Sequence, residues 1–151
     1  MSKDIKFLDY SKLIRENLLN LVKYALKKTS DYGLSDGHHF YITFKTKFKE
    51  NYIPQYLLKN YPEEMMIVIE NEYWDLKVDN AFFSIDLKFK GKIETLKIHF
   101  DSITSFVDPS VSFNLNLDID NKKDKKLQKK LQTDKIKLEN KSNIIFLNPS
   151  K

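Results

Sequence analysis

Two pairs of adjacent side chains are the first candidates for chemistry in this sequence, His38-His39 and Glu63-Glu64. A metal site needs imidazoles that converge on one point, and acid–base catalysis needs carboxylates that face the same substrate atom. Adjacent residues of an extended chain point in opposite directions, so neither pair is expected to converge. We interpret the histidines as ordinary hydrogen-bonding residues where a strand begins, and the glutamates as solubilising turn residues. The chain also has no cysteine and offers no serine elbow or phosphate-binding glycine loop. We therefore predict no catalytic residue, no metal site, no cofactor and no enzymatic activity.

The net charge of +5 belongs to one end of the chain. Residues 1–117 contain 16 basic and 16 acidic residues, whereas residues 118–151 contain 10 lysines and 5 acidic residues. A nucleic-acid-binding domain carries its positive charge on a folded surface, so this distribution argues against nucleic acid as a partner. No apolar run is long enough to span a bilayer, and the N-terminal residues lack the apolar core of a signal peptide. We expect a cytoplasmic protein with no membrane partner.

Apolar periodicity predicts one helix followed by strands. In Asp9–Lys28 the apolar residues recur three and four positions apart, as in an amphipathic helix with one apolar stripe, formed by Ile14, Leu18, Leu21, Val22 and Ala25. Several later segments alternate apolar and polar side chains, which is typical of half-buried strands; they are Phe40–Lys45, Phe83–Lys90, Thr95–Asp101 and Val111–Asp118. We expect a mainly β fold with one N-terminal helix, in which an antiparallel sheet curls into a small barrel or sandwich.

The segment Met65–Ile69 breaks this alternation, because all five of its residues are apolar. A strand that is apolar on both faces has to be covered on both faces, either by the core or by a partner. Tyr73 and Trp74, the only tryptophan, follow closely. Large aromatic side chains beside such a strand serve as anchors in recognition sites, but they are also common in cores. Both interpretations remain open at this point.

The chain changes character near residue 118. We predict that residues 1–117 form the folded domain and that 118–142, rich in lysine and poor in apolar residues, form a flexible linker. Apolar residues return in 143–151, where Ile144, Ile145, Phe146 and Leu147 are consecutive. This short segment either packs back onto the domain or binds another protein. The polarity of the linker favours the second alternative.

Four separate motifs resemble the alphaproteobacterial branch of the SspB family, the specificity-enhancing adaptors of the ClpXP protease. They are Gly37–Phe44 (GHHFYITF), Tyr61–Met65 (YPEEM), Ile67–Ile69 with Tyr73–Leu76 (IVI and YWDL), and Phe106–Val111 (FVDPSV), in this order. The resemblance covers residues 9–117 and implies a homodimeric, Sm-like, largely β domain that binds the ssrA tag of incompletely translated proteins. It also implies a C-terminal motif that docks on the N-terminal domain of the ClpX unfoldase.

The resemblance makes specific residues candidates for each contact. Ile144, Ile145, Phe146 and Leu147, with Lys151, occupy the position of the ClpX-docking motif, although the better-known form carries an arginine inside the apolar run. An extended tag can bind along the edge of a sheet through main-chain hydrogen bonds, with side-chain pockets that select its sequence. The candidate residues of such a groove are Met66, Ile67, Ile69, Tyr73, Trp74 and Leu87. The alternative hypothesis is an Sm-like or OB-like nucleic-acid-binding module, which needs a basic folded face.

Overall fold

The structure is a computed structural model that describes residues 8–118. The elements are α1 (Tyr10–Tyr32), β1 (Phe40–Lys45), α2 (Gln55–Asn60), β2 (Glu64–Ile69), β3 (Tyr73–Val78), β4 (Phe82–Phe89), β5 (Lys92–His99), β6 (Ile103–Asp108) and β7 (Phe113–Asn116), with the 3-10 turns η1 (Phe100–Ser102) and η2 (Pro109–Val111). The predicted ClpX-docking segment, and the predicted linker after Asp118, lie outside the described residues.

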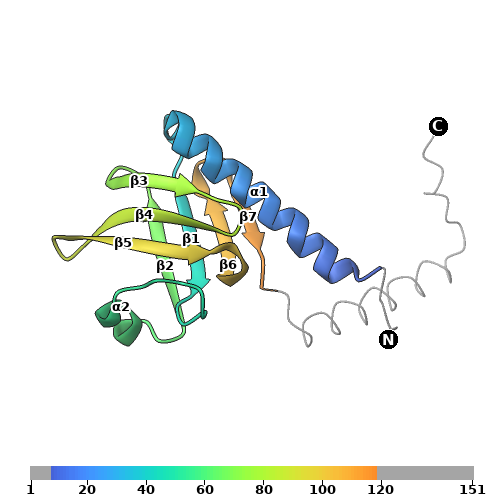
Figure 1. Cartoon of the computed structure of the whole chain (residues 1–151). Coiled ribbons are helices and arrows are strands. Elements are labelled where there is room, and N and C mark those ends of the chain that lie inside the picture. Colours follow the sequence, from blue (N-terminus) through green and yellow to red (C-terminus); the bar gives the residue numbers. More distant parts are fainter. Residues whose placement is uncertain (1–7, 119–151) are drawn as a thin grey trace, which may run out of the picture. The chain divides into compact units, whose positions relative to one another are not determined.

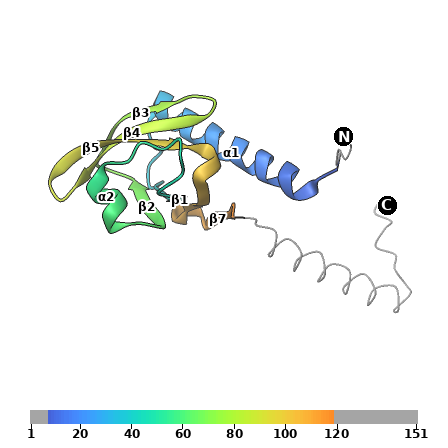
Figure 2. The same ribbon diagram turned by 60° about the horizontal axis from the view of Figure 1, so that its bottom comes forward.

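The strands form two antiparallel sheets. The order is β2-β1-β6-β7 in the four-stranded sheet and β3-β4-β5 in the three-stranded sheet. Figure 1 shows the strands of the two sheets crossing, and Figure 2 shows the sheets as two layers. Within the described residues the sheets share no strand ladder, so the prediction of a mainly β fold with an N-terminal helix is confirmed as a small sandwich and not as a closed barrel.

The core lies between the sheets and under α1. In β1, Phe40, Ile42 and Phe44 point inward and the residues between them point outward, as the alternation predicted. Ile67 and Ile69 of β2 meet them from the neighbouring strand, since Ile42 pairs with Ile67 and Phe40 with Ile69. Burial of each such side chain contributes about 1.5–3 kcal/mol to folding. The inward face of the four-stranded sheet is therefore apolar throughout its centre.

Helix α1 begins after Asp9, whose carboxylate accepts a hydrogen bond from the Lys12 backbone N–H at 3.2 Å. It ends at Gly33, whose φ of 82° is a left-handed conformation that glycine adopts readily. The helix thus continues four residues beyond Asp9–Lys28, the segment in which the amphipathic pattern was found. Its buried residues include Val22, as predicted, together with Leu19, Leu26 and Thr29.

The predicted apolar stripe of α1 is only partly buried. Ile14 and Leu21 are exposed, because the side of α1 that packs against β3 and η1 is centred on Val22 and Leu26. Arg15 lies at the margin of this packed side and joins the helix to the β layers. Its guanidinium donates to the carbonyl oxygens of Asp101 at 2.6 Å and Leu117 at 3.3 Å.

The last predicted strand is shorter than expected. Asp108 ends β6, and its carboxylate accepts a hydrogen bond from the Ser110 backbone N–H, which starts the turn η2. Ser112 then adopts a φ of 56°, so the chain re-enters the sheet only at Phe113. A capping carboxylate and a left-handed residue interrupt a segment whose alternation predicted a continuous strand from Val111 to Asp118.

Candidate functional site

The open edge of the four-stranded sheet is formed by β2. This strand pairs with β1 on one side and, within the described residues, has no strand partner on the other. The backbone N–H and C=O groups along a free edge can pair with a further extended chain. The position of β2 at one side of its sheet is visible in Figure 1.

A groove, here called the β2 groove, lies along this edge and has a volume of about 470 Å³. Its first wall is β2, whose outward residues Met66 and Val68 are 53% and 39% exposed. Its second wall is the end of β4. The residues that line it are Met66, Ile67, Val68, Glu70, Asn71, Glu72, Leu87, Lys88 and Phe89.

Strand register explains why β4 contributes this wall. The β3–β4 ladder has Tyr73 opposite Leu87 at one end, so Lys88 and Phe89 extend beyond β3. These two residues pair only with β5, opposite Ile93 and Lys92. The end of β4 next to the β2–β3 turn is therefore open, and the groove occupies the space between two strand segments that lack a neighbour.

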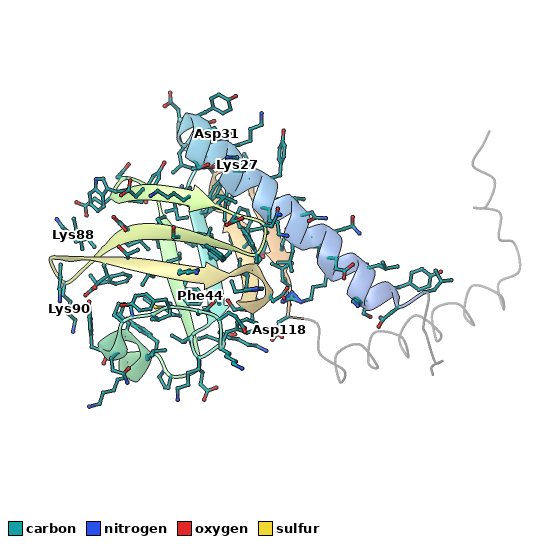
Figure 3. All side chains as sticks on the ribbon, viewed as in Figure 1. Lys27, Asp31, Phe44, Lys88, Lys90 and Asp118 are labelled. Atoms are coloured by element: carbon teal, nitrogen blue, oxygen red, sulfur yellow. The ribbon has the colours of Figure 1, made fainter. Side chains whose placement is uncertain are left out.

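The charges of the groove are carried by its rim. The Lys88 Nζ lies 3.8 Å from the Glu72 Oε2, and both side chains are well exposed. An ion pair of this kind contributes little to stability and is exchanged readily for a ligand's charge. Figure 3 labels Lys88 and Lys90 near the β4–β5 turn. Glu70 adds a second carboxylate to the rim.

The structure brings together some of the predicted site residues and separates others. Met66, Ile67 and Leu87 line the β2 groove, the last two as its largely buried floor. Ile69 is fully buried in the core and does not line it. Tyr73 lines a neighbouring hollow of about 420 Å³ between the Leu34–His38 loop and the β2–β3 turn. Trp74 is 41% exposed on β3, opposite Asp86, and lies outside the groove lining.

The described residues cover only one face of β2, so the core does not account for the whole apolar run and cover by a partner stays a prediction. Met65, Ile67 and Ile69 are buried, but Met66 and Val68 alternate with them on the uncovered outer face of the sheet, next to Thr43 and Tyr41. The apolar run therefore has one core face and one exposed face. Sequence reasoning missed Val68, Lys88 and Phe89; the period of two within β2 was the available signal for Val68.

The two histidines make ordinary hydrogen bonds, as predicted. The His39 Nδ1 lies 3.3 Å from the Gly37 carbonyl oxygen, and the His38 Nδ1 lies 2.6 Å from the Asp108 Oδ2. Ser110 forms a cluster with His38 and Asp108, since its hydroxyl donates to the Asp108 Oδ1 at 2.6 Å. The Ser110 Oγ also lies 3.3 Å from the His38 Nδ1, the same ring nitrogen that contacts Asp108. In a catalytic triad the serine and the carboxylate contact different nitrogens of the histidine, so this cluster does not have the arrangement of a triad.

Burial alone would raise the pKa of Asp108, but hydrogen bonds from Ser110 and His38 and the charge of His38 favour the carboxylate, and the pKa is lowered. The cluster thus links the loop before β1 to the end of β6.

Among residues 8–118 no group of three or more histidine or acidic side chains is placed to hold a metal ion. In the same part of the chain no helix is both long and apolar enough to cross a membrane.

Comparison with known protein families gives a match. The sequence model of one family, SspB (Stringent starvation protein B), matches residues 12–144, which is well over half of the chain. No curated protein sequence matches significantly. The family is one of protease adaptors and not of enzymes. The match covers α1 from residue 12 onward, both sheets and the β2 groove, and the chain therefore belongs to the SspB family.

Proposed function

We propose that this protein is a non-enzymatic adaptor that binds ssrA-tagged polypeptides in the β2 groove and tethers them to the ClpX unfoldase. The observation that carries the proposal is the free edge of β2, flanked by the exposed apolar side chains of Met66 and Val68. Membership of an adaptor family supports the general role. The assignment to the alphaproteobacterial branch stays a prediction from the four sequence motifs.

The groove can hold an extended peptide by adding it to the sheet. Main-chain hydrogen bonds along β2 would contribute about 0.5–1.5 kcal/mol each and would accept many sequences. Selectivity would come from alternate side chains of the peptide, which contact Met66 and Val68 on one wall and Phe89 on the other. The rim residues Glu70, Glu72 and Lys88 would interact electrostatically with charged groups of the peptide.

We further propose that residues 118–142 act as a flexible tether and that Ile144–Leu147 with Lys151 dock on the N-terminal domain of ClpX. A tether of this length has a root-mean-square reach of about 25–30 Å. Tethering at such a range produces an effective concentration on the order of millimolar. Two weak contacts, one between client and unfoldase and one between adaptor and unfoldase, then reinforce each other.

Deleting residues 119–151 separates the two contacts experimentally. We expect calorimetry to give the same affinity, within about twofold, for an ssrA-tag peptide with the full chain and with the chain that ends at Asp118, because the β2 groove is intact in both. Stimulated degradation of a tagged substrate by ClpXP should be lost in the shorter chain. Loss of peptide affinity on deletion, or retained stimulation, would contradict a separable tail.

We also propose that the protein forms a homodimer through the exposed side of α1. Apolar and aromatic residues recur along it at helical spacing and remain uncovered in the single chain; they are Tyr10, Leu13, Ile14, Leu21, Tyr24 and Tyr32. A contiguous apolar stripe on a helix is typical of a protein–protein contact. The hollow of about 400 Å³ beside its C-terminal half could receive side chains of a second copy.

The variant Leu21→Glu/Tyr24→Glu tests this interface. We expect it to raise the dimer dissociation constant by roughly 100-fold or more, because carboxylates would be buried among apolar side chains. Sedimentation analysis measures the change, and the affinity for the tag peptide should stay the same. Asn20→Glu adds one such charge at an exposed position of the same helix and serves as the control. An unchanged sedimentation profile for the double variant would place the interface elsewhere.

A further inference from the structure

A second concave surface, here called the basic pocket, lies between α2 and the segment that follows β1. Its volume is about 800 Å³. The residues that line it are Thr46, Lys47, Phe48, Lys49, Asn51, Gln55, Leu58, Lys59 and Pro62. None of them lines the β2 groove. In Figure 1 this region is at the α2 end of the molecule.

The lysines of the basic pocket are not held in ion pairs with the described residues. Lys47, Lys49 and Lys59 are exposed, and none forms a salt bridge with another described residue. No acidic residue lines the pocket. Glu63 and Glu64 line an adjoining hollow of about 530 Å³, which Lys47 also lines. The Glu64 Oε2 accepts a hydrogen bond from the Thr104 hydroxyl at 3.3 Å. Three lysines therefore line one hollow, and none of them is held in a salt bridge with a described residue.

Thr46 provides an independent observation. It is only 1% exposed, and its Oγ1 is the one buried side-chain oxygen or nitrogen in residues 8–118 that has no hydrogen-bond partner. A buried hydroxyl without a partner is costly, and such groups mark places where a ligand or a water molecule completes the structure. Asn51 also lines the basic pocket, but unlike Thr46 it has hydrogen-bond partners. Its amide donates to the Lys45 carbonyl oxygen and accepts from the His99 N–H.

We propose that the basic pocket binds a small oxyanion of the phosphate class, either free or carried by a nucleotide. The three ammonium groups would neutralise it and donate to its oxygens, and the Thr46 hydroxyl would gain its missing acceptor. Phe48, Leu58 and Pro62 form an apolar wall suited to the organic part of a nucleotide. A water molecule would satisfy Thr46 alone, whereas an oxyanion would contact both Thr46 and the lysines. This inference does not depend on what the β2 groove binds.

The test is a titration of the full-length protein with sodium phosphate, pyrophosphate and ATP at constant ionic strength. Backbone amide shifts should change in Thr46–Pro62. The variant Lys47→Gln/Lys59→Gln should weaken binding by about tenfold or more, since it removes two charge-assisted contacts. Thr46→Val, which keeps the side-chain shape, should weaken binding by about fivefold while the melting temperature of the free protein stays equal or rises. Lys77→Gln removes an exposed lysine on β3 and should change nothing.

The three ligands distinguish the two sources of the oxyanion. Similar affinity for pyrophosphate and ATP identifies a site for the free anion, whereas much tighter binding of ATP identifies a nucleotide site. Constant ionic strength matters because residues 118–151 contain 10 lysines that attract any polyanion. Shifts confined to those residues, unchanged affinity in either pocket variant, or no binding of any of the three ligands at millimolar concentration would overturn the proposal.

Discussion

Replacing Val68 by aspartate is expected to weaken binding of an ssrA-tag peptide by roughly 30- to 150-fold. Val68 lines the β2 groove from the outer face of the edge strand, and it is 39% exposed before a peptide binds. The substitution removes apolar surface that the peptide covers, and it leaves a carboxylate to be desolvated, which together cost about 2–3 kcal/mol. Because the side chain lies outside the core, the fold should remain stable.

Fluorescence anisotropy with a labelled tag peptide measures the affinity, and circular dichroism verifies that the variant is folded. Val111→Asp is the matched control. Val111 is also an exposed valine, but it lies in η2 and does not line the groove. We expect the control to bind the peptide as the wild type does. A folded Val68→Asp protein with wild-type affinity would rule out the edge of β2 as the tag site.

The variant Trp74→Ala tests whether Trp74 contacts the tag peptide, as the sequence predicts, or lies outside the peptide site, as the groove lining indicates. The sequence made Trp74 a candidate contact because it follows the apolar strand, whereas the structure places it outside the groove lining. We expect less than about a threefold change in peptide affinity, since near-neutral substitutions are the norm outside the centre of an interface. A large loss would mean that the peptide continues past the β2–β3 turn onto β3.

Local pattern predicted the elements well where each strand has one polar face. The alternation in Phe40–Lys45 and in Phe83–Lys90 corresponds to β1 and β4. Met65–Ile69 carried no such contrast, because its outward residues Met66 and Val68 are as apolar as its inward ones. An exposed apolar face that awaits a ligand has the same sequence pattern as a face buried in the core.

Other features of the site depend on relations between distant segments. Phe89 forms a groove wall only because β4 extends two residues beyond its ladder with β3, and that register follows from the tertiary pairing. The contact between His38 and Asp108 joins residues 70 positions apart. Spacing along the chain predicts neither relation, since both arise when the two sheets and their loops pack together.

Asp108→Asn is expected to lower the free energy of unfolding by about 2–4 kcal/mol, because it breaks a mostly buried, charge-assisted cluster. Asp108 is 5% exposed, and its carboxylate accepts from the His38 Nδ1 at 2.6 Å and from the Ser110 hydroxyl at 2.6 Å. An ionised carboxylate only accepts, so the hydrogen of this short contact belongs to the His38 Nδ1. An amide cannot accept from both partners and turns a donor toward one of them.

The same substitution should remove part of the acid sensitivity. The pKa of Asp108 lies below the ordinary value of 3.8, because the hydrogen bonds from Ser110 and His38 outweigh the effect of burial. A carboxyl group with a lowered pKa stabilises the fold at pH values above its unfolded pKa, and this contribution disappears as the pH falls through the folded pKa. Wild-type stability should therefore decrease as the pH is lowered below about 4, and the decrease should be smaller in Asp108→Asn.

Urea denaturation at pH 7 and at several acidic pH values measures both effects. Asp31→Asn is the control, since Asp31 forms an ion pair with Lys27 at 3.4 Å in which both side chains are well exposed (Figure 3). Exposed pairs one helical turn apart contribute only about 0.3–0.5 kcal/mol, so this variant should differ little from the wild type. The two substitutions are expected to differ in their effect on stability because Asp108 is buried and Asp31 is exposed. If both variants lost the same small amount of stability, the His38–Asp108–Ser110 cluster would not hold the loop before β1 to the end of β6.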